Sequence, residues 1–191
     1  MKQFFLICLL SCIALAANAA LKEGDTAPDF SAQASLAGKA STYTLKEALQ
    51  KGPVVVYFYP SAYTNGCNLQ AHSFAAQYDK VVAAGASLVG VSLDDISRLN
   101  EFSADPEFCA GKFPVSSDAD GKISKSYGLT VKDAGSGKKD SKGHDIQHGF
   151  AERTTFVITP DGKIAAAIGG LKAKENVDKT LDVLQHLVGS H

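Results

Sequence analysis

The stretch that decides the fold is Val54-Val-Val-Tyr-Phe-Tyr-Pro60-Ser-Ala-Tyr-Thr64-Asn-Gly-Cys67-Asn-Leu-Gln-Ala-His-Ser-Phe74. It opens with an unbroken run of β-branched and aromatic residues, which predicts a fully buried strand. Pro60 ends that strand, because proline has no N–H to contribute to a sheet. Beyond Thr64 the apolar residues fall three and four positions apart, which predicts a helix. Cys67 is therefore expected in the first turn of a helix that follows a central strand.

This position gives Cys67 a chemical role. A helix N-terminus presents unpaired N–H groups and the positive end of the helix dipole, and both favour a thiolate over a thiol. The Thr64 hydroxyl, three residues upstream, can reach the sulfur or a ligand beside it, and Pro60 can shield the pocket without adding a donor. The alternative is that Cys67 is a buried core cysteine or half of a structural disulfide.

The pattern Pro60-x-x-x-Thr64-x-x-Cys67 after a buried strand resembles the active-site motif of the peroxiredoxins, and most of all their bacterioferritin-comigratory, or Q-type, branch. Gly-x-x-Ala-Pro-x-Phe at residues 24–30 resembles the N-terminal segment of the same family. The resemblance implies a thiol peroxidase that reduces hydrogen peroxide and organic hydroperoxides through a sulfenic acid on Cys67. We expect no cofactor.

Arg153 stands at the start of an apolar run, residues 154–158, that predicts a strand. The family places its active-site arginine in this strand, so the resemblance gives that role to Arg153. A guanidinium stays charged at any working pH and would hold both the thiolate and the developing oxyanion. The alternative is a surface ion pair with Glu152 or Asp161. Arg98, the other arginine of the chain, is interpreted as an exposed helix residue.

For turnover, the hypothesis is an intramolecular disulfide between Cys67 and Cys109 that a thioredoxin-like reductant opens again. Many Q-type members have the resolving cysteine five residues after the first, where this chain has His72, and Asn65 replaces the usual proline of the family. Cys109 lies in the second helix region, where other members carry their resolving cysteine, and Pro106 breaks that helix. The disulfide would require local unwinding of the helix turn at Cys67.

Three alternatives stay open from the sequence. One is a one-cysteine cycle that an external thiol resolves. Another is a non-enzymatic thioredoxin-fold domain in which Cys67–Cys109 is a permanent disulfide, worth about 4 kcal/mol in the loop-entropy description. The third is a disulfide exchanger, against which the lack of a Cys-x-x-Cys motif argues.

Residues 1–19 are predicted to be a signal peptide. Lys2 gives a short positive head, residues 4–16 are apolar, and Ala-Asn-Ala at 17–19 is a small-x-small cleavage site. The apolar stretch is too short to span a bilayer, although a membrane anchor or a buried first helix are the alternatives. The expected organisation is this leader followed by one thioredoxin-like peroxiredoxin domain at 20–191, exported to the bacterial periplasm. Cleavage would leave Cys67 and Cys109 as the cysteines of the mature chain.

Charge excludes some partners. The 19 Lys and Arg balance 20 Asp and Glu, for a formal net charge of −1, so nucleic acid and anionic membranes are poor candidates. After leader removal we therefore expect no membrane partner. Q-type members are often monomers, so the resemblance also implies a monomer.

The order of elements predicts an α/β thioredoxin-like fold, a central mixed β-sheet flanked by helices with an N-terminal extension. An early strand–helix–strand crossover requires a parallel pair of strands. Strands at 154–158 and 163–168, joined by the Thr159-Pro160-Asp161-Gly162 turn, add an antiparallel hairpin.

Val131 to Gly149 interrupts the apolar pattern with Gly, Ser, Lys and Asp and predicts an exposed, mobile loop. His144 and His148 lie four residues apart, a spacing that suits a metal ion in a helix. The glycines argue against a helix and no third ligand is evident, so these are interpreted as solvated loop histidines and no metal is expected.

Overall fold

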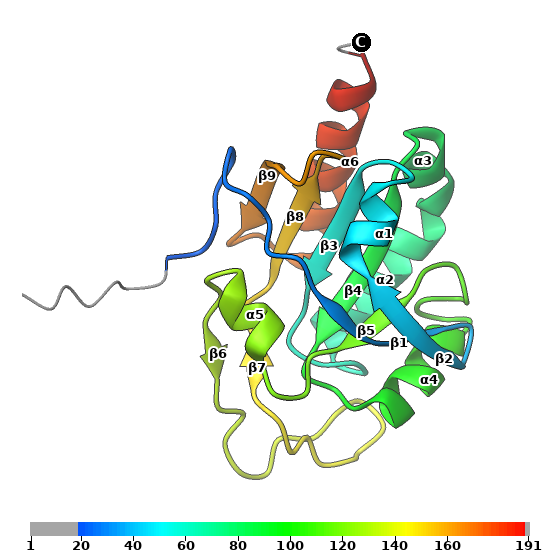
Figure 1. Cartoon of the computed structure of the whole chain (residues 1–191). Helices are drawn as coiled ribbons and strands as arrows, with labels where there is room; N and C mark the ends of the chain where they lie inside the picture. The colour runs from blue at the N-terminus through cyan, green and yellow to red at the C-terminus, as the bar shows by residue number, and fades with distance from the viewer. Residues whose placement is uncertain (1–18, 190–191) are drawn as a thin grey trace, which may run out of the picture.

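The computed structural model in Figure 1 describes residues 19–189, so all of the predicted signal peptide except Ala19 lies outside the described residues. The strands are Ser31–Leu36 (β1), Lys39–Thr44 (β2), Val54–Phe58 (β3), Ser87–Ser92 (β4), Val115–Ser117 (β5), Val131–Lys132 (β6), Phe150–Ala151 (β7), Thr154–Ile158 (β8) and Ile164–Gly169 (β9). The helices are Leu45–Leu49 (α1), Asn65–Ala76 (α2), Tyr78–Ala83 (α3), Ile96–Ala104 (α4), Lys122–Ser126 (α5) and Ala173–Gly189 (α6).

Within the described residues, the central sheet has the strand order β2-β1-β5-β4-β3-β8-β9, and β6 and β7 form a separate pair. Strand β3 runs parallel to β4, and β4 runs parallel to β5. On its other side β3 pairs antiparallel with β8, which continues into the antiparallel β9. The expected parallel crossover and late hairpin are both present, which confirms the mixed sheet.

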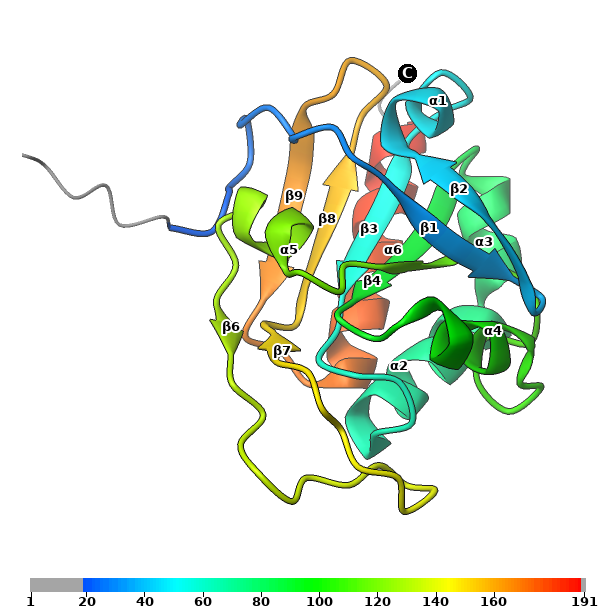
Figure 2. The ribbon, with the colours of Figure 1, turned by 60° about the horizontal axis from the view of Figure 1, so that its bottom comes forward.

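The strands bury alternate side chains on opposite faces of the sheet. Val55 and Tyr57 of β3 pack in a core cluster with residues of α2, α3, α4 and α6. Val54 and Val56 pack in a second cluster with residues of α1 and the segment around α5. Figure 2 shows this arrangement, with α5 in front of the sheet and α6 behind it. Both faces of β3 are thus covered, which explains why its sequence is apolar without alternation.

The predicted helix after β3 begins at Asn65, with Thr64 in the N-cap position, and is interrupted at Gln77. The apolar spacing of the sequence runs through this break, so it predicted one helix where the structure has α2 and α3. Cys67 is the third residue of α2 and lies in its first turn, as expected.

One edge of the sheet gathers the chemistry-bearing segments. Because β3 and β4 are parallel, both end at this edge, where Pro60 and Asp94 follow them. Strand β8 runs the other way and begins there, since Thr154 lies opposite Phe58. Arg153 therefore precedes β8 at the place where the Cys67 helix starts.

The long loop, residues 133–149 between β6 and β7, runs along this same edge below α2 and α4 (Figure 2). It is exposed over most of its length, but Ala134, Asp140 and Ile146 are buried. The Ser141 N–H donates to the Tyr63 carbonyl at 2.7 Å. The predicted exposure therefore holds for most of the loop and is wrong at Ala134, Asp140 and Ile146.

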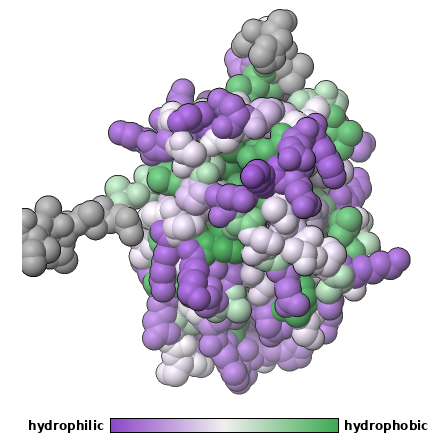
Figure 3. Space-filling model, viewed as in Figure 1, coloured by the Kyte–Doolittle hydropathy of each residue, from purple (hydrophilic) through white to green (hydrophobic). Residues whose placement is uncertain are grey.

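The face seen in Figure 1 is largely hydrophilic, with smaller apolar areas near its centre and along its right side (Figure 3). Within residues 19–189, no helix combines the length and the apolar character needed to cross a bilayer.

Candidate active site

The structure brings the two central site residues of the sequence prediction together. Cys67 is 2% exposed and its Sγ accepts a hydrogen bond from Arg153 Nη2 at 3.3 Å. The contact places a permanently charged hydrogen-bond donor directly against the sulfur. The alternative in which Arg153 forms a surface ion pair with Glu152 or Asp161 is not the one observed.

Gly66 makes this contact sterically accessible. A Cβ atom at position 66 would lie 3.1 Å from Arg153 Nη2, tighter than ordinary van der Waals contact. Glycine at this position therefore lets the guanidinium lie against the first turn of α2.

A chain of hydrogen-bonded, buried side-chain amides holds the Arg153 guanidinium in place. Arg153 Nη1 donates to Gln70 Oε1, and Gln70 Nε2 donates to Asn176 Oδ1 at 3.0 Å. Asn176 also accepts from Thr155 Oγ1 at 2.6 Å and donates from Nδ2 to the Ile168 carbonyl at 2.8 Å. Gln70, Asn176 and Thr155 are fully buried, so α2, α6, β8 and β9 together fix the guanidinium.

This amide chain was only partly predictable from the sequence. Gln70 follows Cys67 by three residues, so it falls on the same face of α2. That spacing could have identified Gln70. No sequence pattern indicated Asn176, which lies 106 residues after Gln70 on α6.

Thr64 directly precedes α2, and its carbonyl accepts a hydrogen bond from the Cys67 N–H at 2.9 Å. Thr64 Oγ1 donates its proton to the Ser61 carbonyl at 2.8 Å and not to Cys67. Its oxygen lone pairs remain free to accept a hydrogen bond from a ligand. Pro60 follows Tyr59, whose N–H makes a 3.0 Å bond to Val91 beyond the end of β3.

Cys109 lies after α4, in the turn that follows Pro106, and not in a helix. It is fully buried, and both described cysteines are free thiols in one apolar cluster. Burial, and secondarily the charge of Asp105, raises the pKa of the Cys109 thiol far above its usual range. In this position Cys109 is therefore a protonated and unreactive thiol at neutral pH.

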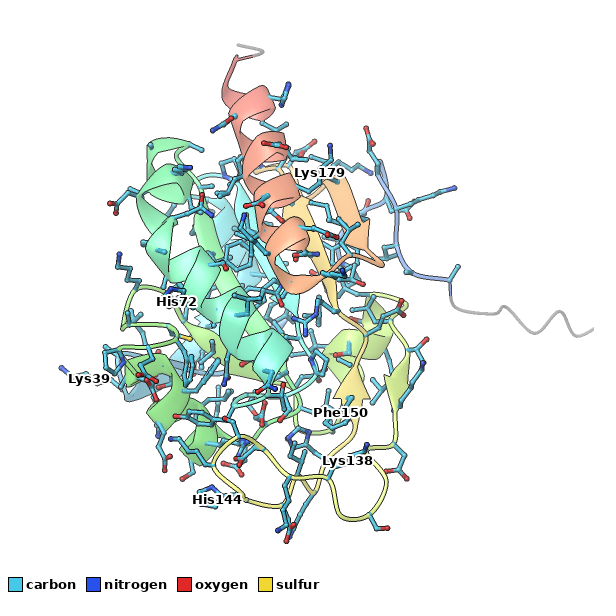
Figure 4. The ribbon with its side chains drawn as sticks, turned by 180° about the vertical axis from the view of Figure 1, so that it is seen from behind. Lys39, His72, Lys138, His144, Phe150 and Lys179 are labelled. Carbon is cyan, nitrogen blue, oxygen red and sulfur yellow. The ribbon has the colours of Figure 1, made fainter. Side chains whose placement is uncertain are left out.

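His72, which replaces the expected resolving cysteine of the family pattern, joins α2 to this turn. Its Nδ1 donates to the Glu107 carbonyl at 2.9 Å, two residues before Cys109. Figure 4 shows His72 on the outer side of α2. The residue thus helps to keep the Cys109 turn docked against the helix that carries Cys67.

Two further sequence interpretations are wrong, and a buried carboxylate is the reason. Asp94 has no exposed side-chain surface and forms ion pairs with Arg98 Nε at 2.8 Å and with His148 Nε2 at 2.9 Å. Arg98, expected to be exposed, is 16% exposed and also pairs with Asp140 at 2.7 Å. His148, expected to be solvated, is 19% exposed, whereas the His144 side chain is 68% exposed. Buried charges require such partners.

His144 is therefore mostly exposed and His148 mostly buried, and the two rings pair with different carboxylates, Asp140 and Asp94. Within the described residues, no group of three or more His, Cys, Asp or Glu side chains is arranged to hold a metal ion.

A buried thiol in contact with a guanidinium suits attack on an electrophilic oxygen, the chemistry of a cysteine-based peroxidase on a thioredoxin-like sheet. The chain belongs to the AhpC/TSA family, which matches residues 23–167. It is 32% identical over 165 residues to peroxiredoxin Bcp of Escherichia coli K12, covering 86% of this chain and 96% of the relative. The chloroplastic peroxiredoxin Q of Populus jackii is 33% identical over 146 residues, covering 75% and 61% respectively.

Solved structures of similar fold belong to proteins of the same kind. Peroxidoxin BcpB of Mycobacterium tuberculosis matches with a TM-score of 0.72 at 29% identity, over 87% of this chain and 98% of that one. The bacterioferritin comigratory protein of Xanthomonas campestris matches with a TM-score of 0.64 at 29% identity, over 82% and 91%. The thioredoxin-like fold and the peroxiredoxin family are thus confirmed, and the protein is a cysteine-based thiol peroxidase, an oxidoreductase.

Proposed function

We propose that Cys67 is the peroxide-reducing cysteine and that hydrogen peroxide and organic hydroperoxides are its substrates. The observation that carries this proposal is the 3.3 Å hydrogen bond from Arg153 Nη2 to the buried Cys67 Sγ. The X. campestris relative, whose structure is described in connection with alkyl peroxide reduction, supports the substrate class.

In the proposed step the Cys67 thiolate attacks one peroxide oxygen, the O–O bond breaks, and the other oxygen leaves as alkoxide or hydroxide that takes up a proton. The sulfur is oxidised to a sulfenic acid and the peroxide is reduced to an alcohol or water. Arg153 stabilises the charge as it moves from sulfur to oxygen. Thr64 Oγ1 accepts a hydrogen bond from the peroxide, and Pro60 limits water access.

We propose Cys109 as the resolving residue. Its thiol condenses with the Cys67 sulfenic acid, giving a disulfide and water, and a thioredoxin-type dithiol then reduces the disulfide. Both partners must move, because Cys67 lies in a helix turn and Cys109 is fully buried. A one-cysteine cycle with an external thiol is the alternative. A monomer suffices for the proposed cycle, since both cysteines are on one chain.

The resolving role predicts that one equivalent of peroxide converts the reduced protein to a Cys67–Cys109 disulfide, which peptide mass mapping detects. In Cys109→Ser, the same treatment should leave Cys67 as a sulfenic acid that a dimedone-type reagent traps. Thioredoxin-linked turnover of this variant should fall by at least about tenfold. Unchanged turnover would establish the one-cysteine cycle, and a wild-type disulfide that resists mild dithiol would indicate a structural bond.

We further propose that residues 1–19 are a cleaved leader and that the protein works in the bacterial periplasm. The charged head, apolar stretch and Ala-Asn-Ala motif support this assignment. The expected result is that the protein isolated from its native cells begins at Ala20 by intact mass. A mass that retains Met1 to Ala19 would show that no leader is removed.

A further inference from the structure

The buried Asp94 carboxylate is bonded to the loop that precedes the Cys67 helix. Asp94 Oδ2 accepts from the Ala62 N–H at 2.8 Å, and Oδ1 accepts from Ser61 Oγ at 3.0 Å. Arg98 Nη2 donates to the Ala62 carbonyl at 2.8 Å. Both backbone polar groups of Ala62 are therefore held by one ion pair, two residues before Thr64.

The long loop reaches the same ion pair from the other side. His148 Nε2 donates to Asp94 at 2.9 Å, and Asp140 accepts from Arg98 at 2.7 Å. The neighbouring residue Tyr63 has a φ of 57°, a left-handed conformation that is uncommon for a non-glycine residue and needs external support. The long loop supplies such support through its 2.7 Å bond from Ser141 N–H to the Tyr63 carbonyl.

The hydrogen bonds of His148 require a doubly protonated ring. Nε2 faces the Asp94 carboxylate, and Nδ1 lies 2.8 Å from the Gly149 carbonyl, so both partners are acceptors. A neutral imidazole has one N–H and can satisfy only one of them, whereas the imidazolium satisfies both. Arg98 pairs with both buried carboxylates, Asp94 and Asp140, and a charged His148 adds a second cation at Asp94.

Other charged groups surround this arrangement. A cavity of about 280 Å³ beside His148 is also lined by Asp95 and Glu101 of the α4 region and by His144 and Asp145 of the long loop. Burial disfavours the charged ring, but the hydrogen bond and charge of Asp94 outweigh burial and raise the pKa of His148, even against the repulsion of Arg98. Burial likewise opposes the Asp94 carboxylate, yet His148 and the donated hydrogen bonds lower its pKa.

Resting on the proposed peroxidase function, we propose that His148 is a positioning residue for the reaction. Through Asp94 it ties the long loop to residues 61–63 and thereby holds Thr64 and the Cys67 helix turn in their reactive arrangement. The link is present while His148 is charged. It is lost as pH rises through the pKa of His148 in the folded protein. A neutral ring can donate to only one of its two acceptors, and Arg98 is then, among the described residues, the only cation that pairs with both Asp94 and Asp140.

The test compares His148→Ala and His148→Gln with the matched control His144→Ala. His144 belongs to the same loop and its side chain is 68% exposed; its ring lies 3.7 Å from Asp140, whereas His148 bonds Asp94 at 2.9 Å. The rate constant for oxidation of Cys67 by stoichiometric hydrogen peroxide is measured by rapid alkylation and mass spectrometry. At neutral pH we expect His148→Ala to be about tenfold slower than wild type, because small misplacements of reacting groups cost rate steeply. His144→Ala should match wild type.

The pH dependence separates positioning from a purely structural role. The quantity compared is the ratio of wild-type to His148→Gln rate constants at each pH, in which pH effects common to both proteins cancel. We expect this ratio to fall towards one at alkaline pH, where wild type also loses the charge. Trypsin cleavage after Lys138 and Lys139 should be about tenfold faster in His148→Ala than in His144→Ala, because the loop opens more often.

The outcomes are distinct. If wild type reacts with peroxide and His148→Ala stays within about twofold of it with a folded circular dichroism spectrum, the positioning role is wrong and the peroxidase stands. If the ratio of wild-type to His148→Gln rate constants does not change with pH, the positioning role is likewise wrong. If His148→Ala does not fold, the His148→Gln profile decides. If wild type does not react with peroxide, the proposed function itself fails.

Discussion

Replacement of Cys67 by serine is expected to abolish peroxide reduction, lowering the rate by at least about a thousandfold, because a hydroxyl at neutral pH is not a nucleophile comparable to a thiolate. The substitution is nearly isosteric, so the fold should persist. The measurement is peroxide consumption by the reduced protein at stoichiometric peroxide, followed by intact mass. Wild type should gain a disulfide, and Cys67→Ser should keep its reduced mass.

The matched control is Cys109→Ser, which removes the other buried thiol but leaves the Cys67–Arg153 contact in place. It should still consume the first equivalent of peroxide. If Cys67→Ser consumes peroxide at the wild-type rate, the reaction occurs elsewhere in the protein and the assignment of Cys67 fails.

Removal of the guanidinium at Arg153 should have the second largest effect. Arg153→Met is expected to slow oxidation of Cys67 by about 10²- to 10³-fold, the typical cost of losing a preorganised group that stabilises transition-state charge. Arg153→Lys keeps the charge but lacks the planar guanidinium whose two terminal nitrogens bond Cys67 and Gln70, so it should recover only part of the rate. Rate constants at several peroxide concentrations provide the measurement.

A control for loss of charge is Lys179→Met, which removes an exposed cation on α6. Arg153→Met also leaves buried Gln70 Oε1 without its donor, which should lower the free energy of unfolding by about 1–3 kcal/mol. Thermal unfolding of each variant is therefore measured beside its rate constant, so that a loss of stability can be told apart from a loss of reactivity. Equal rates for Arg153→Met and wild type would remove the guanidinium from the mechanism.

Much of the fold was predictable because local and global signals agree in β3, β4, β8 and β9. Each of these strands is an apolar run bounded by proline, glycine or capping residues, which are strong local signals. The adjacency of Cys67 and Arg153 was also predictable, although through family resemblance and not through spacing. The break between α2 and α3 was not, because it leaves the apolar periodicity intact.

The charged cluster at Asp94 could be predicted only in part. Asp94 follows a parallel strand at the edge where Pro60 follows the neighbouring one, and residues in such positions meet in space. Its partners His148 and Asp140 come from a loop whose composition is that of a solvated segment. Composition indicates the average environment of a segment and not that of the few side chains that turn inward, so the prediction for His148 was wrong. The prediction for Arg98 was wrong because its buried partners, Asp94 and Asp140, were not predicted.

The order of the chain has a consequence for biosynthesis. Cys67 is synthesised 86 residues before Arg153, and the antiparallel pairing of β3 with β8 brings them together only when the chain is present as far as β8. Because a domain of this size folds as a unit, an incomplete nascent chain carries an ordinary cysteine. The contact between Arg153 and Cys67 thus requires that β8 has paired with β3.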